Sequence, residues 1–136
     1  MILKKVEVVA AIIHFEDEIL CVQRAKNKLS YISEKYEFPG GKIEEGESQE
    51  EALRRELVEE LNVVADIQSL FLTIVHQYPD FELTMHSFTC KVNSKEITLN
   101  EHIAFNWLRV DELESLDWAA ADIPIVKKLK NKKYAR

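Results

Sequence analysis

The sequence predicts an α/β fold built on one β-sheet and two substantial helices. Strand-like runs rich in Val and Ile alternate with two segments of good helix formers, one in the middle of the chain and one near its C-terminus. The apolar run at 5–15 ends at an acidic turn and is typical of a central strand. At 136 residues the chain is long enough to bury a core, so we expect one domain over 1–136.

The first half of the chain predicts a pair of strands followed by a polar loop. Residues 5–15 and 19–23 are the two strands, paired across the acidic turn at 16–18. Arg24 stands at the end of the second strand. Residues 25–35 are polar and are expected to line the mouth of a site.

The central helix has clear signals at both ends. A turn at 39–41 (Pro-Gly-Gly) excludes a helix or strand interior there. Ser48 is the predicted N-cap, and Glu51 completes a capping box with it. Good helix formers continue to Leu61, and Asn62 is the predicted terminator because Asn tolerates the left-handed conformation.

One face of this helix gathers carboxylates beside an apolar stripe. Glu56, Glu59 and Glu60 fall within an arc of roughly 100°, and like charges at these spacings repel. A bound cation would relieve that repulsion, and clustered carboxylates suit Mg²⁺ or Mn²⁺. A solvated acidic helix is the alternative. It explains the other acids of the segment but not carboxylates at the edge of a buried face.

The second half of the chain predicts three more strands and a final helix. Residues 63–76 are expected to form one long strand or a bent pair of strands. The pattern also supports strands at 81–92 and 105–110, a turn at 78–80, a polar linker at 93–101, a helical turn at 111–116 and an amphipathic helix at 123–130.

Composition limits the function classes. The net charge of −6 argues against a general nucleic-acid-binding surface, so no stable nucleic-acid partner is expected. Eight of the acids lie between 44 and 60, which favours a metal and, through it, a phosphate. Cys21 and Cys90 lie in apolar runs and are expected to be buried free thiols in a reducing compartment. No run reaches transmembrane length, so we expect a cytoplasmic protein without a membrane partner.

Residues 41–63 resemble the Nudix box. The matching positions are Gly41, Glu47, the segment 55–60 (Arg-Glu-Leu-Val-Glu-Glu) and Val63, and the family's late glycine is Asn62 here. Residues 36–44 (YEFPGGKIE) resemble, more narrowly, the MutT branch, which hydrolyses nucleoside triphosphates. The resemblance implies the Nudix α/β/α sandwich, with a mixed sheet between the box helix and the C-terminal helix.

The resemblance also implies the roles of the box residues. Glu56 is the expected general base, acting through a bound water, and Arg55 is expected to pair with Glu47 to lock the loop against the helix. Cluster carboxylates titrate together, so the base could be another of them. The implied ligands of Mg²⁺, or of Mn²⁺, are the Gly40 carbonyl, Glu56, Glu59, Glu60 and, from a loop, Glu101.

Substrate contacts are expected outside the box. By resemblance Arg24 binds the substrate phosphates. Asp122 precedes Pro124 and therefore suits a helix N-cap, while the resemblance implies that it reads the base edge. Tyr78 or Phe81 could stack on a base, although an aromatic beside a hairpin turn is more often packing.

The implied reaction releases a nucleoside monophosphate and pyrophosphate from a nucleoside triphosphate. The expected role is sanitation of modified nucleotides, with 8-oxo-dGTP and a CTP- or dCTP-type nucleotide both open. Alternatives are a Nudix hydrolase of dinucleotide polyphosphates or ADP-ribose, or a non-catalytic nucleotide-binding module. The chain is expected to be a monomer or a homodimer.

Overall fold

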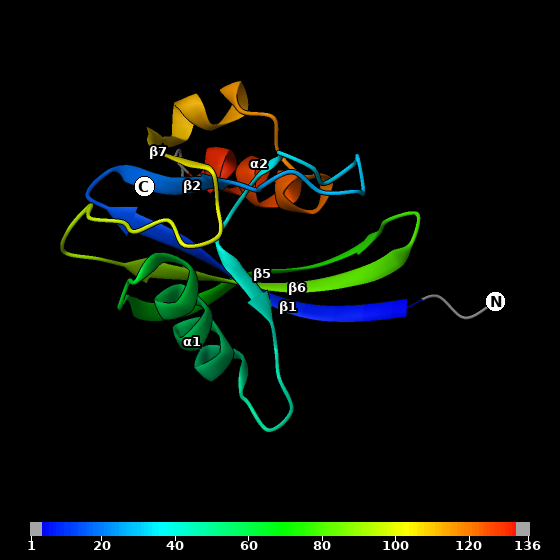
Figure 1. The fold of residues 1–136 in the computed structure, drawn as a ribbon. Helices are drawn as coiled ribbons and strands as arrows, with labels where there is room; N and C mark the ends of the chain where they lie inside the picture. Colours follow the sequence, from blue (N-terminus) through cyan, green and yellow to red (C-terminus); the bar gives the residue numbers. More distant parts are fainter. Residues whose placement is uncertain (1–3, 133–136) are drawn as a thin grey trace.

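The computed structural model describes residues 4–132 and confirms the predicted α/β fold (Figure 1). A seven-stranded sheet runs through the molecule, with α1 on one side and α2 on the other. The elements are β1 (Lys4–Phe15), β2 (Glu18–Gln23), β3 (Tyr36–Glu37), β4 (Gly40–Lys42), α1 (Gln49–Leu61), β5 (Asp66–Gln77), β6 (Phe81–Lys91), β7 (Ala104–Arg109), the 3₁₀ segments η1 (Val110–Ser115) and η2 (Ala120–Asp122), and α2 (Ile123–Lys132).

Strand β1 organises the sheet because it pairs on both edges. Along one edge it runs parallel to β6 from Lys4 to His14, and all its other pairings are antiparallel, so the sheet is mixed. The other edge is divided: β4 pairs with residues 8–10, and β2 pairs only at His14 and Phe15. The chain crosses from β3 to β4 within this divided edge, where the Ala11 N–H donates to the Pro39 carbonyl at 2.8 Å.

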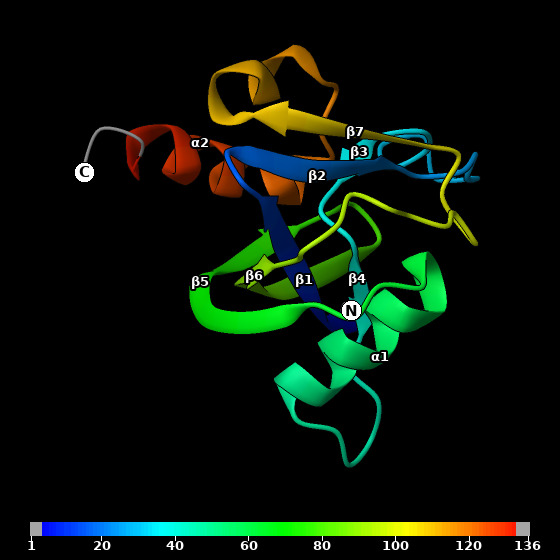
Figure 2. The same ribbon diagram turned by 90° about the vertical axis from the view of Figure 1, so that its left-hand side faces the viewer.

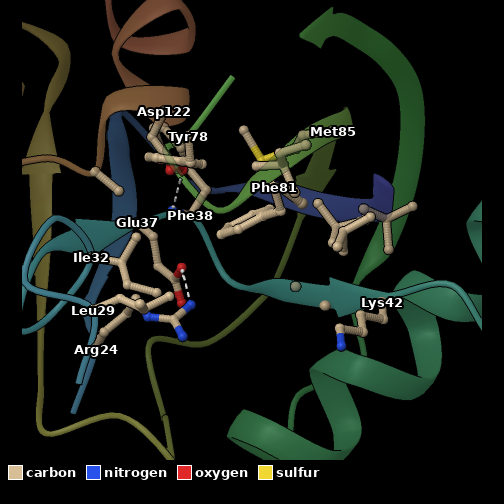
Figure 3. Close-up of a pocket in the computed structure, with 18 of the residues that line it drawn as sticks. Arg24, Leu29, Ile32, Glu37, Phe38, Lys42, Tyr78, Phe81, Met85 and Asp122 are labelled. Carbon is tan, nitrogen blue, oxygen red and sulfur yellow. Dashed lines mark hydrogen bonds and ion pairs between the residues drawn. The ribbon is translucent and has the colours of Figure 1, made fainter. Parts of the chain in front are cut away.

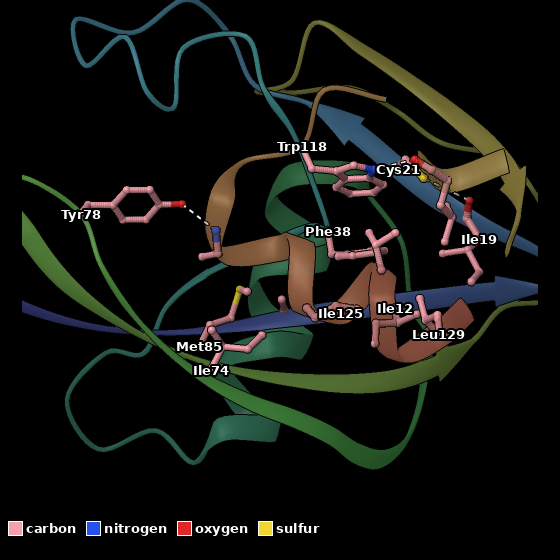
Figure 4. Packing of buried hydrophobic residues seen from close by; sticks show 14 residues of the cluster. Ile12, Ile19, Cys21, Phe38, Ile74, Tyr78, Met85, Trp118, Ile125 and Leu129 are labelled. Atoms are coloured by element: carbon pink, nitrogen blue, oxygen red, sulfur yellow. Dashed lines mark hydrogen bonds between the residues drawn. The ribbon is translucent and has the colours of Figure 1, made fainter. Parts of the chain in front are cut away.

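The side chains of β1 alternate between two hydrophobic cores. Val9, Ala11 and Ile13 pack with α1, whereas Ala10 and Ile12 pack with α2 and the 3₁₀ segments. Figure 4 shows Ile12 beside Ile125 and Leu129 of α2. Both faces of β1 are therefore buried, which explains its unbroken apolar sequence.

Both predicted ends of the box helix are confirmed. Ser48 caps α1, with the reciprocal bonds to Glu51 that define a capping box. Asn62 ends the helix in the left-handed conformation at φ 55°, and its N–H donates to the Leu57 and Val58 carbonyls. The short strand β4 and the following loop bring the chain to the start of α1 (Figure 2).

The prediction that a strand begins at residue 63 is wrong, because β5 begins at Asp66. Val63 still belongs to the helix terminus, since its N–H donates to the Leu57 carbonyl, and it is buried in the core around α1. Cys21 and Cys90 are buried free thiols, as predicted. Within residues 4–132, no helix is long and apolar enough to cross a membrane.

Candidate active site

A pocket of about 520 Å³ lies in the divided edge of the sheet, within the size range of ligand sites. Its inner end is lined by the apolar side chains of Phe38, Tyr78 and Met85, with Asp122 beside them (Figure 3). Its outer end reaches the backbone of 40–42, next to the carboxylate face of α1. The predicted loop at 25–35 contributes Lys28, Leu29 and Ile32 to the lining, which confirms that it borders the pocket.

Asp122 is the polar group at the inner end. It is 4% exposed, and its Oδ1 accepts from the Phe38 backbone N–H at 3.0 Å (Figure 3). Burial and then the charge of Glu37 raise the pKa of Asp122 well above its ordinary value. A protonated carboxyl group can both donate and accept, which an ionised one cannot.

Of the two roles that the sequence leaves open for Asp122, the helix cap is not the one that its carboxylate takes. Among residues 4–132 its carboxylate accepts from Phe38, on the other side of the pocket, and not from the first turn of α2. The reason is local: Asp122 already lies in the 3₁₀ turn η2, which continues into α2 at Ile123. An N-cap residue typically has extended backbone geometry, whereas Asp122 is the last residue of a 3₁₀ turn.

Tyr78 and Phe81 both line the pocket, but Tyr78 is well packed. Its side chain is 5% exposed, its ring stacks on Tyr31 at 5.3 Å, and its hydroxyl accepts from the Ala121 N–H. Phe81 is only half-buried and lies 5.1 Å from the Tyr78 ring. Stacking on a base therefore stays a prediction, with Phe81 the more accessible ring.

Glu37 is a site residue that the sequence analysis missed. Its Oε1 pairs with Arg24 Nη1 at 3.1 Å, and its Oε2 lies 2.9 Å from His102 Nε2. Arg24 and Glu37 both line the pocket, so the predicted phosphate-binding arginine is held in place by a carboxylate (Figure 3). A Glu within the segment 36–44 was visible in the sequence, but its partners come from distant strands and loops.

Glu60 and Glu56 form the buried part of the carboxylate cluster. Glu60 is 8% exposed, and its Oε1 accepts from the Gly40 N–H at 3.3 Å. Burial, with the charges of Glu56, Glu37 and Glu101, raises the pKa of Glu60 to about 9. Burial also raises the pKa of Glu56, against the opposing effect of Arg55. The charges of Glu56 and Glu101 both act on the pKa of Glu60, so these carboxylates lie within electrostatic range of one another.

Arg55 connects this cluster to the loop before the helix. Its Nε and Nη2 donate to the two carboxylate oxygens of Glu47 at 2.6 and 2.9 Å, and its Nη2 also donates to the Lys42 carbonyl. The hydrogen bonds from Arg55 lower the pKa of Glu47 to about 2. The predicted pairing of Arg55 with Glu47 is thus present in the structure.

The donor set of the cluster fits a hard divalent cation. Carboxylate oxygens are the preferred ligands of such ions, and the mutual repulsion in the cluster calls for a positive charge. Gly41 leaves the space that Glu56 fills, because a Cβ there would lie 2.4 Å from the Glu56 carboxylate. Among residues 4–132, however, no three acidic, His or Cys side chains are already grouped to hold a metal ion.

Arg55 occupies part of the space between the carboxylates of Glu56 and Glu59. Its Nη1 lies 3.0 Å from Glu56 Oε1 and 3.2 Å from Glu59 Oε1. A cation that took these two oxygens as ligands would have to displace Nη1 from them, while the bonds to Glu47 and Lys42 hold the rest of the Arg55 guanidinium. Glu59 is half exposed, at 51%, and is free to make that change.

The NUDIX domain family model matches residues 3–129. The chain belongs to the Nudix family. It is 33% identical over 129 residues to an Escherichia coli (strain K12) 8-oxo-dGTP diphosphatase, covering 94% of this chain and 98% of that one. It is 34% identical over 124 residues to a CTP pyrophosphohydrolase of the same organism, with coverages of 91% and 90%. The solution structure of the E. coli ORF135 protein superposes with a TM-score of 0.84 at 32% identity, over 98% of this chain and 94% of that one.

Membership of this family confirms the hydrolase class and the Nudix fold that the box implied. Nudix hydrolases generally use divalent metal ions, which agrees with the donor set around Glu56 and Glu60.

Replacing Asp122 with Asn is expected to change how stability depends on pH. In the wild type the folded-state pKa of Asp122 is raised, so folding retains a proton that the unfolded chain releases above about pH 4. Wild-type stability therefore falls as the pH rises from there towards the folded-state pKa. Asn has no proton to lose and still offers an oxygen to the Phe38 N–H.

The melting temperatures of the two proteins, measured from pH 4 to 9, test this. The advantage of Asp122→Asn should grow steadily with pH, and a difference that is constant across the range would contradict a protonated Asp122.

Proposed function

We propose that this Nudix hydrolase is a Mg²⁺-dependent nucleoside triphosphate pyrophosphohydrolase that releases a nucleoside monophosphate and pyrophosphate. One observation carries the proposal: the nucleoside-sized pocket ends at residues 40–42, where the backbone contacts the carboxylate cluster of α1. A base bound at Asp122 would extend its phosphates towards Glu56 and Glu60. Relatives that share a third of the sequence over nearly the whole chain are named for this reaction type.

The charges along the pocket match a substrate with an apolar base and an anionic tail. The walls around Asp122 are apolar and aromatic. The rest of the lining contains four basic residues, Lys4, Arg24, Lys28 and Lys42, and the acids Glu37 and Asp80. Arg24 has a fixed orientation through Glu37, which lowers the entropy lost when its guanidinium binds a phosphate.

Hydrolysis requires a water to attack phosphorus, a P–O anhydride bond to break, and a proton to leave the water. Glu56 is the proposed general base because its side chain is largely buried and its carboxylate lies beside Gly41, which lines the pocket. Glu59, Glu60, Glu101 and the Gly40 carbonyl are the proposed companions of Glu56 in holding Mg²⁺. When bound, that ion would neutralise phosphate charge and lower the pKa of the attacking water.

Arg55 and Glu47 have a supporting role in this proposal. The two bonds between them, with the bond to the Lys42 carbonyl, fix the loop that precedes α1 against the helix. That arrangement sets the position of Gly40 and Gly41 relative to the carboxylates.

Two classes of nucleobase, cytosine and oxidised guanine, are proposed for the substrate. A protonated Asp122 presents a hydroxyl donor beside an acceptor, and both bases have an edge with an acceptor next to an N–H donor. The two named relatives represent these same two classes. We propose sanitation of modified or surplus nucleotides as the cellular role.

A panel of substrates tests the proposal. Pyrophosphate release would be measured with CTP, dCTP, 5-substituted dCTP, dGTP and 8-oxo-dGTP, each with Mg²⁺ and with EDTA. We expect Mg²⁺-dependent release and a clear preference for one of the two base classes. Absence of pyrophosphate release from every triphosphate would refute the proposed function.

A further inference from the structure

Glu101 lies on an exposed loop, yet it is expected to act at a defined place in the carboxylate cluster. The loop connects β6 to β7 and passes the C-terminal end of α1 on its way to β7 (Figure 2). The residue before it, Asn100, is hydrogen-bonded to the Glu59 and Glu60 carbonyls, and the charge of Glu101 acts on the pKa of both Glu56 and Glu60. An exposed glutamate has substantial conformational entropy to lose on binding, and something must hold its backbone.

On the N-terminal side, Asn100 fastens the loop to α1. Its backbone N–H donates to the Glu60 carbonyl at 3.0 Å, and its Nδ2 donates to the Glu59 carbonyl at 2.9 Å. These are carbonyls of the last helical turn, which have no partner within the helix. Asn100 therefore caps the helix that carries the proposed metal ligands and fixes the residue next to Glu101.

On the C-terminal side, His102 fastens the loop to the pocket. Its side chain is 4% exposed, and its Nε2 lies 2.9 Å from Glu37 Oε2. A carboxylate paired with Arg24 is an acceptor, so Nε2 carries the hydrogen of this bond. The next residue, Ile103, donates its N–H to the Gln23 carbonyl at the end of β2.

We infer that Asn100 and His102 are positioning residues that hold Glu101 at the carboxylate cluster, one through α1 and the other through Glu37. This inference rests on the proposed function, because it assumes that the cluster binds a divalent ion. It goes further by making Glu37 a shared support: one oxygen orients Arg24, and the other holds the loop that carries Glu101. Groups that orient metal ligands commonly affect metal affinity by about 10- to 100-fold.

Binding of Mn²⁺ alone to the full chain, followed by electron paramagnetic resonance of the free ion, tests the inference without reference to catalysis. The variants are His102→Leu, Asn100→Ala, Glu101→Gln and the double variant His102→Leu/Glu101→Gln. His102→Gln retains an N–H donor for Glu37. Asn93→Ala, at an exposed asparagine of the same loop, is the matched control. Thermal unfolding establishes that each variant is folded.

We expect the Kd for Mn²⁺ to rise about 10- to 100-fold in His102→Leu and in Asn100→Ala, and to be largely restored in His102→Gln. If His102 acts through Glu101, His102→Leu will add no further loss in the Glu101→Gln background. The control should bind like the wild type.

Three outcomes would overturn the inference. An unchanged Kd in both His102→Leu and Asn100→Ala would do so, as would a loss in His102→Leu that persists in full when Glu101 is Gln. Both leave the proposed function intact if the wild type binds Mn²⁺. A wild-type protein that binds no Mn²⁺ would overturn the inference and the proposed metal site together.

Discussion

Replacing Glu59 with Gln is expected to lower kcat by about two to four orders of magnitude. The substitution keeps the shape of the side chain and removes one charge from the proposed metal site. Loss of several kcal/mol of charge stabilisation corresponds to about tenfold in rate for each 1.4 kcal/mol. Glu59 is 51% exposed and contributes no core contact, so folding should be unaffected. Initial rates at saturating triphosphate and a range of Mg²⁺ concentrations measure the effect.

Glu50→Gln is the control for this prediction. Glu50 is an exposed acid in the first turn of the same helix, away from the pocket and the cluster. Its removal changes the net charge by the same amount and should leave kcat within about twofold, as for other surface changes. A turnover number like that of the wild type in Glu59→Gln would show that Glu59 is not part of the metal site.

Gly40→Ala is expected to have the largest effect on stability among the glycine substitutions. A Cβ at Gly40 would lie 1.9 Å from the Val9 carbonyl oxygen and 2.8 Å from the Ala10 Cα, both in the backbone of the central strand β1. Backbone atoms of a buried strand cannot move aside cheaply, so the cost is about 3 kcal/mol or more. The melting temperature should fall by about 10 °C or more.

Gly46→Ala is the control that distinguishes a steric clash from the cost of placing a side chain on backbone with a positive φ. Gly46 has a φ of 85°, which disfavours a side chain, but no atom lies within 4 Å of a Cβ placed there. The cost is then about 1 kcal/mol, or about 4 °C in melting temperature. Equal losses in the two variants would contradict a steric role for Gly40.

The part of the site carried by one helix could be predicted from the sequence. Ser48, Glu51 and Asn62 act on backbone groups within five residues, so their roles follow from local spacing. The same helical spacing places Glu56, Glu59 and Glu60 on one face of α1. Local rules were sufficient for these residues.

The part of the site built between elements could not be predicted in that way. His102 and Glu37 are 65 residues apart in the sequence, and Asp122 and Phe38 are 84 apart. Their bonds depend on how β3, the loop before β7 and η2 meet at the divided edge of the sheet. A pattern in one segment carries no information about a partner in another. For that reason Glu37 was missed, and the hydrogen bond from Phe38 to Asp122 was not foreseen.

The central claim is that the carboxylates of α1 and the adjoining pocket together cleave nucleoside triphosphates to a monophosphate and pyrophosphate. ³¹P NMR of the products formed from CTP and from 8-oxo-dGTP, with Mg²⁺ and with EDTA, tests it most directly. The account predicts monophosphate and pyrophosphate signals that appear together, only with Mg²⁺, and from at least one of the two substrates. Release of inorganic phosphate with a diphosphate, or turnover that continues in EDTA, would contradict it.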